Sequence, residues 1–249
     1  MSPRLSFAID AAYRAGRFTL QYFQTGAEVE TKSDETPVTA ADKGAERVIR
    51  EMLSQRYPSE AILGEEEGGS SARDRWVIDP IDGTKSFVSG VPLYATLLSY
   101  EVDGEAVLGV CYFPALDEML YAEKGAGAFF NGRPAKVSDK RDVKGSVLAC
   151  GGLNSMKKRG RTNGFEKISD VALATRTWSD AYGHALVATG RIEAMVDPIV
   201  NPWDISALSL IVREAGGQFT DFAGNSELSD EAISSNGHVH AKVMEVFQG

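Results

Sequence analysis

The sequence predicts an α+β first half joined to an α/β second half. Two segments with apolar residues at helical spacing open the chain. A run of hairpin signals follows between Tyr94 and Val137, and strands alternate with helices from Ser146 onward. At 249 residues the chain is near the upper limit for one hydrophobic core. We therefore expect either one two-part domain over residues 1–249 or two small domains, with an α+β part at 1–140 and an α/β part at 141–249.

The composition is that of an ordinary globular protein, and it excludes several classes. The formal net charge of −9 argues against a general nucleic-acid-binding protein. No apolar run approaches the roughly 18 residues that cross a bilayer, and charged residues interrupt the N-terminal segment where a signal peptide needs an apolar core. Cys111 and Cys150 have no metal-ligand spacing. We therefore expect two reduced thiols that serve packing, in a cytoplasmic protein without a nucleic-acid or membrane partner.

Two helices are predicted near the N-terminus. The first begins at Ser2-Pro3, because proline is favoured in a first helical turn, and its apolar face starts at Leu5. The polar segment 29–38 is expected to be extended or a loop. The second helix begins after Thr39, which has capping-box spacing to Asp42. From the local sequence alone, this cap is the simplest role for Asp42.

Short strands and then hairpins are predicted next. Residues 61–63 form a strand, and three acids follow at 65–67, in a position that suits either a solvated loop or a metal ligand. Trp76–Ile78 is a buried strand that we expect to stop at Asp79-Pro80, because proline cannot continue a ladder. Turn signals at Asp103-Gly104 and Asn131-Gly132 indicate an antiparallel sheet. Its predicted strands are Tyr94–Val102, Val107–Phe113, Glu118–Glu123 and Gly127–Phe130.

In the second half, Ser146–Cys150 is predicted to be a strand. The basic, glycine-rich segment Gly151–Gly164 is typical of a mobile surface loop, and a contact with a phosphate or a partner is the less favoured alternative. Asn201 and Pro202 mark the start of a helix. The remaining predicted strands are Leu173–Trp178, Ile192–Val196, Gln218–Phe222 and Ala232–Ser234, and the helices are Tyr182–Ala188, Asn201–Ala215 and Val239–Phe247.

Covalent and nucleotide-cofactor chemistry have little support. The three histidines, His184, His238 and His240, all come late in the chain, and the last two are expected at the surface. No serine lies in a G-x-S-x-G elbow, and the sequence has neither a P-loop nor a G-x-G-x-x-G fingerprint.

Carboxylates are better candidates. Glu65, Asp79 and Asp82 follow short strands, and Asp204 lies in the first turn of a helix, where an acid also complements the macrodipole. Asp79 and Asp82 precede Gly83-Thr84, which suits a helix start that favours an anion. Acids beside an anion site are compatible with a phosphate if divalent cations lie between them. Oxygen ligands without histidine or cysteine favour Mg²⁺ or Mn²⁺ over zinc.

Three motifs together carry a resemblance that spans nearly the whole chain. Gly64-Glu65-Glu66, the run Trp76–Thr84, and Pro202–Ala207 with Glu214–Gly217 resemble the inositol monophosphatase family in order and spacing. This resemblance implies a layered αβαβα sandwich, one catalytic domain and commonly a homodimer. It also implies a lithium-sensitive phosphatase of small phosphate esters that binds two or three Mg²⁺ ions.

The resemblance also implies a role for each motif residue. Glu65, Asp79, the Ile81 carbonyl and Thr84 would serve one ion. Asp79, Asp82 and Asp204 would serve a second, and Glu65 would help to hold a third. The backbone N–H groups of Gly83 and Thr84 would bind phosphate oxygens, and Asp42 would hydrogen-bond Thr84. A metal-bound water oriented by Glu65 and Thr84 would attack phosphorus in line, while the second ion stabilises the leaving alkoxide.

The substrate is indicated by two further segments. Lys85-Ser86-Phe87 with Gly-Val-Pro after it is similar to the histidinol-phosphate phosphatase branch of the family. Arg176 and Asp180 match that branch's R-x-x-G-D segment, although Ser179 replaces its glycine. Asp180 is then either a counter-ion for the amine of histidinol or a cap for the following helix. The alternatives are a phosphatase of inositol phosphate or another small sugar or nucleotide phosphate, and a nonenzymatic metal-binding interaction protein.

Overall fold

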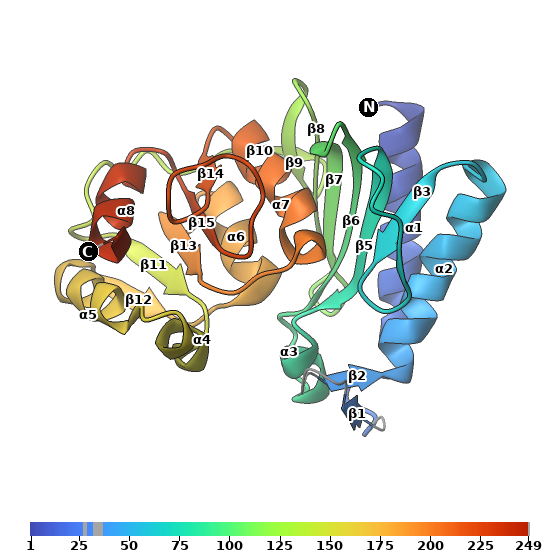
Figure 1. The fold of residues 1–249 in the computed structure, drawn as a ribbon, viewed down its shortest axis with the longest axis horizontal. Coiled ribbons are helices and arrows are strands. Elements are labelled where there is room, and N and C mark those ends of the chain that lie inside the picture. Colours follow the sequence, from blue (N-terminus) through green and yellow to red (C-terminus); the bar gives the residue numbers. More distant parts are fainter. Residues whose placement is uncertain (27–28, 32–36, 249) are drawn as a thin grey trace.

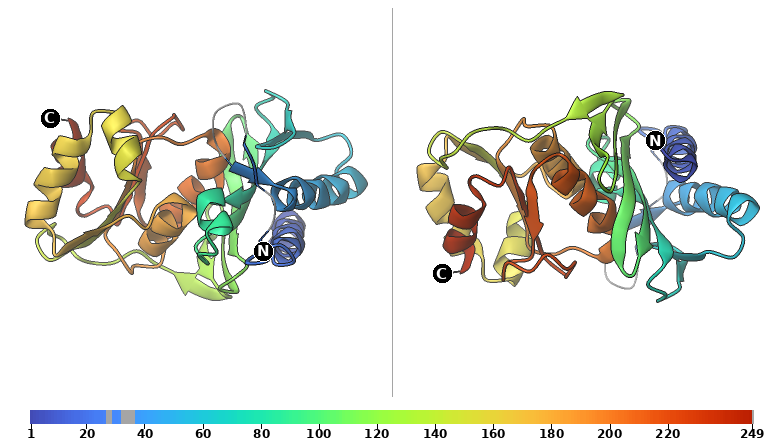
Figure 2. Two further views of the ribbon diagram at one scale, coloured as in Figure 1. Left: turned by 90° about the horizontal axis from the view of Figure 1, so that it is seen from below. Right: turned by 90° about the horizontal axis from the view of Figure 1, so that it is seen from above.

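The computed structural model describes residues 1–26, 29–31 and 37–248, which form five layers in the order helix, sheet, helix, sheet, helix (Figures 1 and 2). The predicted αβαβα sandwich is confirmed. The residues of the 29–38 segment that the structure describes are extended, as a pairing of β1 (Val29–Thr31) with β2 (Pro37–Thr39). The rest of that segment, residues 32–36, lies outside the described residues.

The first sheet has eight strands in the order β10-β9-β8-β7-β6-β5-β3-β4. Its outer face is covered by α1 (Pro3–Thr19) and α2 (Ala40–Arg56), whose alanine-rich faces pack around Trp76 and Leu98. The short helix α3 (Thr84–Val88) follows β5 directly. The strands are β3 (Ala61–Gly64), β4 (Gly68–Gly69), β5 (Arg75–Asp82), β6 (Ala95–Val102), β7 (Glu105–Phe113), β8 (Glu118–Glu123), β9 (Gly127–Phe130) and β10 (Arg133–Ala135).

The second sheet has five strands in the order β12-β11-β13-β15-β14. The helices α6 (Asp180–Ala188) and α7 (Pro202–Glu214) lie between the two sheets and contribute to the largest apolar core. The outer layer holds α4 (Leu153–Lys158), α5 (Thr162–Val171) and α8 (His240–Gln248). The strands are β11 (Val147–Cys150), β12 (Ala174–Arg176), β13 (Ala194–Asp197), β14 (Gln218–Thr220) and β15 (Ala232–Ser235).

The prediction that a strand stops at Asp79-Pro80 is wrong. Strand β5 continues to Asp82, and its pairing with β6 shifts register between Asp79 and Asp82. Proline is tolerated at such a bulge because the extra residues there are not needed as ladder donors. The Pro80 carbonyl instead accepts a hydrogen bond from Thr96 Oγ1 at 2.9 Å. The bulge places two acids close together on one strand end.

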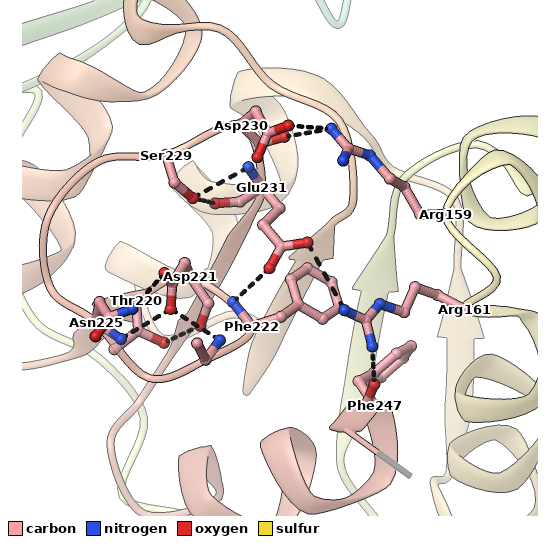
Figure 3. A network of polar contacts seen from close by, with 11 residues as sticks. Arg159, Arg161, Thr220, Asp221, Phe222, Asn225, Ser229, Asp230, Glu231 and Phe247 are labelled. Carbon is pink, nitrogen blue, oxygen red and sulfur yellow. Dashed lines mark hydrogen bonds and ion pairs between the residues drawn. The ribbon is translucent and has the colours of Figure 1, made fainter.

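The prediction of a mobile loop at 151–164 is also wrong. The segment forms α4 and the start of α5, because Met156 and Ile168 are buried in a second core, the apolar cluster between the second sheet and the helices α4, α5 and α8. Its arginines are structural (Figure 3): Arg159 pairs with Asp230, and Arg161 lies 3.9 Å from the Glu231 carboxylate and donates to the Phe247 carbonyl at 2.6 Å. The basic residues therefore tie the 221–231 segment and α8 to this layer.

Three smaller expectations can be compared with the structure. His238 is exposed as expected, whereas His240 is buried, with its ring nitrogens bonded to Thr220 and Ser235. Cys111 and Cys150 are free and buried, which confirms their packing role. No helix of the described residues is long and apolar enough to cross a membrane.

Candidate active site

The end of β5 supplies two buried carboxylates. Asp79 accepts a hydrogen bond from the Ile81 amide at 3.1 Å, which fixes the turn of the bulge. Asp82 accepts one from the Ala181 amide, at the start of α6, at 2.6 Å. Because α6 belongs to the second half of the chain, this bond places the bulge against the layer between the two sheets.

Helix α7 supplies a third carboxylate. Asp204 is the third residue of the helix, and its Oδ2 accepts from the Asn201 amide at 2.7 Å, which completes a capping box. Asp79, Asp82 and Asp204 each offer an oxygen, and these three atoms lie within 4.8 Å of one another. The dipole interpretation of Asp204 and the site interpretation are thus compatible.

The electrostatics of this cluster are unfavourable without a cation. Burial, and then the charges of Glu65 and Asp82, raise the pKa of Asp79 well above its usual value. Burial and then Asp180 and Asp204 do the same for Asp82. Burial also raises the pKa of Asp204 to about 7, against the hydrogen bond from Asn201. Among the described residues, none of the three acids of the cluster forms a salt bridge. Several buried carboxylates with no cationic partner form a site that favours a divalent ion.

The other motif residues surround the cluster. Glu65 follows β3, its amide donates to the Ile78 carbonyl at 3.1 Å, and its carboxylate is close enough to Asp79 to raise the pKa of that group. Thr84 donates to the Ile81 carbonyl at 3.1 Å and lies at a longer 3.5 Å from Asp42 Oδ1. These positions bring the side chains of four separate segments to one place.

Asp42 fills both roles that the sequence left open. Its Oδ2 accepts from the Thr39 amide at 2.8 Å, so the capping box is present. Its Oδ1 faces Thr84. Gly83 precedes α3 in the left-handed region, at φ 81°, where a glycine is needed. Among the described residues, no side chain caps the amides at the start of α3.

Asp180 lies next to this cluster. The cap interpretation is wrong, because among the described residues the Asp180 carboxylate accepts from the Ser179 hydroxyl at 3.3 Å and from no amide of the first turn of α6. Ser179 is extended, whereas Asp180 has φ 58°, so the unusual conformation lies one residue after the replaced glycine. Its carboxylate faces Gly83. Burial raises the pKa of Asp180, and the hydrogen bond from Ser179 and the charge of Lys85 oppose this only in part.

A small cavity adjoins Asp82 and Asp204, and two of its ionisable residues, His184 and Asp197, were not selected from the sequence. It measures about 40 Å³ and is lined by Asp82, Asp180, Asp204, His184 and Asp197, with apolar neighbours. Asp197 is the last residue of the buried strand β13 and precedes a proline, and Asp79 likewise lies in a buried strand before a proline. That repeated pattern is a signal that could have identified Asp197. Burial, Asp180 and Asp204 raise its pKa well above the usual value.

Two predicted substrate residues are not brought to the cluster by any recorded contact. Arg176 is exposed, and its guanidinium donates to the neighbouring Thr175 carbonyl at 2.8 Å. Ser86 is half-buried in α3, where its carbonyl accepts from the Val91 amide.

Comparison with known proteins shows the family to which the chain is similar. The model of the inositol monophosphatase family matches residues 1–248. A histidinol-phosphatase of Chlorobaculum parvum is 42% identical over 233 residues, covering 92% of this chain and 90% of the relative. A fructose-1,6-bisphosphatase/inositol-1-monophosphatase of Thermotoga maritima is 37% identical over 255 residues, covering 98% and 95%.

Among solved structures, the Thermotoga maritima IMPase aligns with a TM-score of 0.92 and 36% identity, over 99% of this chain and 97% of that one. The family match extends over both halves of the chain, including every element that carries the clustered acids. The chain therefore belongs to the inositol monophosphatase family of phosphoric monoester hydrolases.

Proposed function

We propose that the protein hydrolyses a small phosphate monoester with the help of Mg²⁺, and that Asp79, Asp82 and Asp204 hold the ions. The convergence of these three carboxylates within 4.8 Å is the observation that carries this. All of the donors are hard oxygens, which suit Mg²⁺ and also Mn²⁺. A bound cation would offset the repulsion that raises their pKa values.

Glu65 and the Ile81 carbonyl complete the proposed metal-binding set. Glu65 is near enough to raise the pKa of Asp79, so its carboxylate would be within reach of an ion that Asp79 binds. The Ile81 carbonyl accepts from Thr84 and keeps a second lone pair for a cation. Two or three ions would then lie along the β5 bulge.

The reacting groups would be oriented by the chain itself. Bound Mg²⁺ would polarise the phosphate and lower the pKa of a water in the site. Thr84 Oγ1, held between the Ile81 carbonyl and Asp42, would orient that water together with the Glu65 carboxylate. The amides of Gly83 and Thr84 would donate to phosphate oxygens, which a helix start favours. Asp82 and Asp204 would in addition contact the substrate.

For the substrate we propose histidinol phosphate. Its ammonium group needs an anion near the phosphate site, and Asp180 is a half-buried acid whose carboxylate faces Gly83. Asp197 adds a second acid on the adjoining cavity. The name of the Chlorobaculum parvum relative supports the same ester. Ser86 and Arg176 remain proposed contacts, on the sequence resemblance alone.

The alternative substrate is inositol 1-phosphate or another small sugar or nucleotide phosphate. The Thermotoga maritima relative, named for fructose 1,6-bisphosphate and inositol 1-phosphate, favours this second candidate. Such esters carry hydroxyl groups in place of an ammonium, so they would gain less from Asp180.

Phosphate release in Mg²⁺ from histidinol phosphate and from inositol 1-phosphate, at matched concentrations, tests the choice. We expect faster release from histidinol phosphate. The Asp180→Asn variant should lower kcat/KM for that ester about 10–100-fold, since a hydrogen bond to a charged group contributes about 1.5–3 kcal/mol. The same variant should change inositol 1-phosphate turnover far less. Asp170→Asn, an exposed acid on α5, is the matched control.

Each result has a distinct meaning. Preference for inositol 1-phosphate, or an equal effect of Asp180→Asn on both esters, would overturn the assignment of histidinol phosphate. Absence of phosphate release from every ester tested, with Mg²⁺ still bound, would favour a nonenzymatic metal-binding role instead.

A further inference from the structure

A polar stripe runs along α2, a helix that is otherwise apolar where it meets the sheet. Asp42, Glu46 and Arg50 are spaced four residues apart, which places them on one face of the helix. Asp42 and Glu46 are completely buried, and the Arg50 side chain is mostly so. Asp42 already has a place beside Thr84, so the question is what Glu46 does one turn later.

Glu46 binds the backbone of the segment that follows Glu65. Its Oε2 accepts from the Glu66 amide at 2.8 Å, and its Oε1 accepts from the Glu67 amide at 3.1 Å. Arg50 completes the arrangement, because its Nε donates to Glu46 Oε1 at 2.7 Å. The buried charge is thus paired and fully hydrogen-bonded, as such a charge must be.

Arg50 also reaches the same segment directly. Its Nη2 donates to the Gly68 carbonyl at 2.6 Å, and its Nε lies 3.5 Å from the Glu67 carboxylate. Two side chains of α2, Glu46 and Arg50, therefore hydrogen-bond two amides and one carbonyl of the turn at 65–68.

Gly64 is an independent sign that this contact is close. A Cβ at Gly64 would overlap the Glu46 carboxylate and lie 2.8 Å from Arg50 Nη2. Gly64 lies in a strand, where a glycine is otherwise unfavourable, so the close approach of Glu46 explains it.

The consequence concerns Glu65. Its amide is held by the Ile78 carbonyl, one residue before Asp79, and the next two amides are held by Glu46. We propose that Glu46, braced by Arg50, is a positioning residue that fixes Glu65 against Asp79. The effect of this positioning on catalysis rests on the proposed function, in which Glu65 is a metal ligand and orients a water. Helix α2 would then position Thr84 through Asp42 and Glu65 through Glu46.

The Glu46→Gln variant tests this in the full-length protein. A glutamine has the same shape as glutamate, but its amide N–H₂ replaces one of the two acceptor oxygens. That N–H₂ group would then face a donor, either Arg50 Nε or one of the Glu66 and Glu67 amides. Glu51→Gln is the matched control, because it makes the same change at an exposed position of the same helix. Hydrogen exchange should become faster at the 65–68 amides, without Mg²⁺ present, in Glu46→Gln and not in the control.

Calorimetric titration with Mg²⁺ is the second readout, and it needs no substrate. We expect the affinity to fall about 10–100-fold in Glu46→Gln, as is typical when a residue that orients a metal ligand is changed. In phosphate-release assays kcat should fall while KM for the ester stays near the wild-type value. In the double variant Glu46→Gln with Glu65→Gln, the losses of Mg²⁺-binding free energy and of kcat should be less than the sum of those in the single variants. Glu46 acts through the Glu65 carboxylate, and the second change removes that carboxylate.

Several outcomes would overturn the role. Faster exchange with unchanged Mg²⁺ affinity and kcat would mean that the turn does not position Glu65. Additive losses in the double variant would mean that Glu46 acts elsewhere. If Glu46→Gln does not fold, Arg50→Gln is the second test, because it keeps both amide contacts of Glu46. This variant should also weaken Mg²⁺ binding, by a smaller factor. Unchanged Mg²⁺ affinity in Arg50→Gln would refute the proposed role of the Arg50–Glu46 pair. Lack of phosphate release by the wild type would refute the proposed function, while exchange and Mg²⁺ affinity would still test the positioning.

Discussion

Helix α7 lies close to the first sheet at Gly109, and this contact leads to a specific prediction about activity. A Cβ at Gly109 would lie 2.7 Å from the Ala207 carbonyl oxygen and 3.0 Å from the Ala207 Cα. Both neighbours are backbone atoms of α7, so a change of side-chain rotamer cannot relieve the overlap. Gly109→Ala therefore forces the helix away from β7.

The size of the effect follows from the distances. Ordinary contact begins at 3.4 Å, so α7 must retreat by about 0.7 Å, and overpacking of this kind costs about 1–3 kcal/mol. The retreat is opposed because Ser206 Oγ is bonded to Ser99 Oγ and to the Glu101 carboxylate, each at 2.7 Å. Asp204 lies one turn before Ala207 and would move with it. A misplacement of about 1 Å in a catalytic site costs on the order of 100-fold.

We expect Gly109→Ala to lower the melting temperature by about 2–4 °C for each kcal/mol lost and to lower kcat by about 10–100-fold, with a small change in KM. Thermal unfolding and Mg²⁺-dependent phosphate release measure both. Gly152→Ala is the control, because Gly152 has a negative φ and no atom within 4 Å of its would-be Cβ. Wild-type turnover in a destabilised Gly109→Ala protein would refute the idea that the sheet sets the position of Asp204.

Three further predictions concern buried ionisable groups. Asp82→Asn should keep the fold, abolish most turnover and raise the melting temperature of the metal-free protein, because it removes a buried charge and leaves an acceptor for the Ala181 amide. Near-normal turnover would contradict this. Asp204→Asn and Asp204→Ala should lose turnover equally, but the alanine variant should be about 1 kcal/mol less stable in denaturant unfolding, because it alone loses the cap. Burial lowers the pKa of His184 from 6.5 to about 3. The folded state therefore binds this proton less well than the unfolded state, and stability is lost as the pH falls below about 6.5. Relative to His184→Asn, the wild type should lose about 2 kcal/mol between pH 6.5 and 5. The exposed His238→Asn control should show no such difference, and parallel pH profiles for wild type and His184→Asn would contradict the burial argument.

Residue patterns within one or two turns were sufficient to predict most of the helices and strands and to identify the acids of the motifs. Caps at Ser2, Thr39 and Asn201 mark the true starts of α1, α2 and α7, because a cap is set by residues within one turn. What could not be predicted depends on contacts between distant segments. The bond from the Ala181 amide to Asp82 spans 99 residues, and it joins the two halves at the site. No local signal placed His184 beside the cavity.

The misread segments have the same physical origin. Charge and glycine content made residues 151–164 resemble a loop, but burial of Met156 and Ile168 against the second core stabilises helices there. Pro80 ended a strand in the sequence-based prediction, whereas the bulge lets the β5 pairing resume at Asp82. In each case a tertiary contact outweighed a local preference.

The acids Asp42 and Asp204 show why local and functional interpretations need not compete. Both occupy the third position of a helix and accept from the cap residue's amide with Oδ2. That bond fixes the rotation of the carboxylate, so the other oxygen has a defined direction. In Asp42 it faces Thr84, and Asp204 shares the cluster with Asp79 and Asp82. The partial positive charge of the helix start also favours the ionised form that a cation needs. A capping box therefore fixes the orientation of a functional carboxylate. The two helices that carry these carboxylates, α2 and α7, pack on opposite faces of the β5 strand.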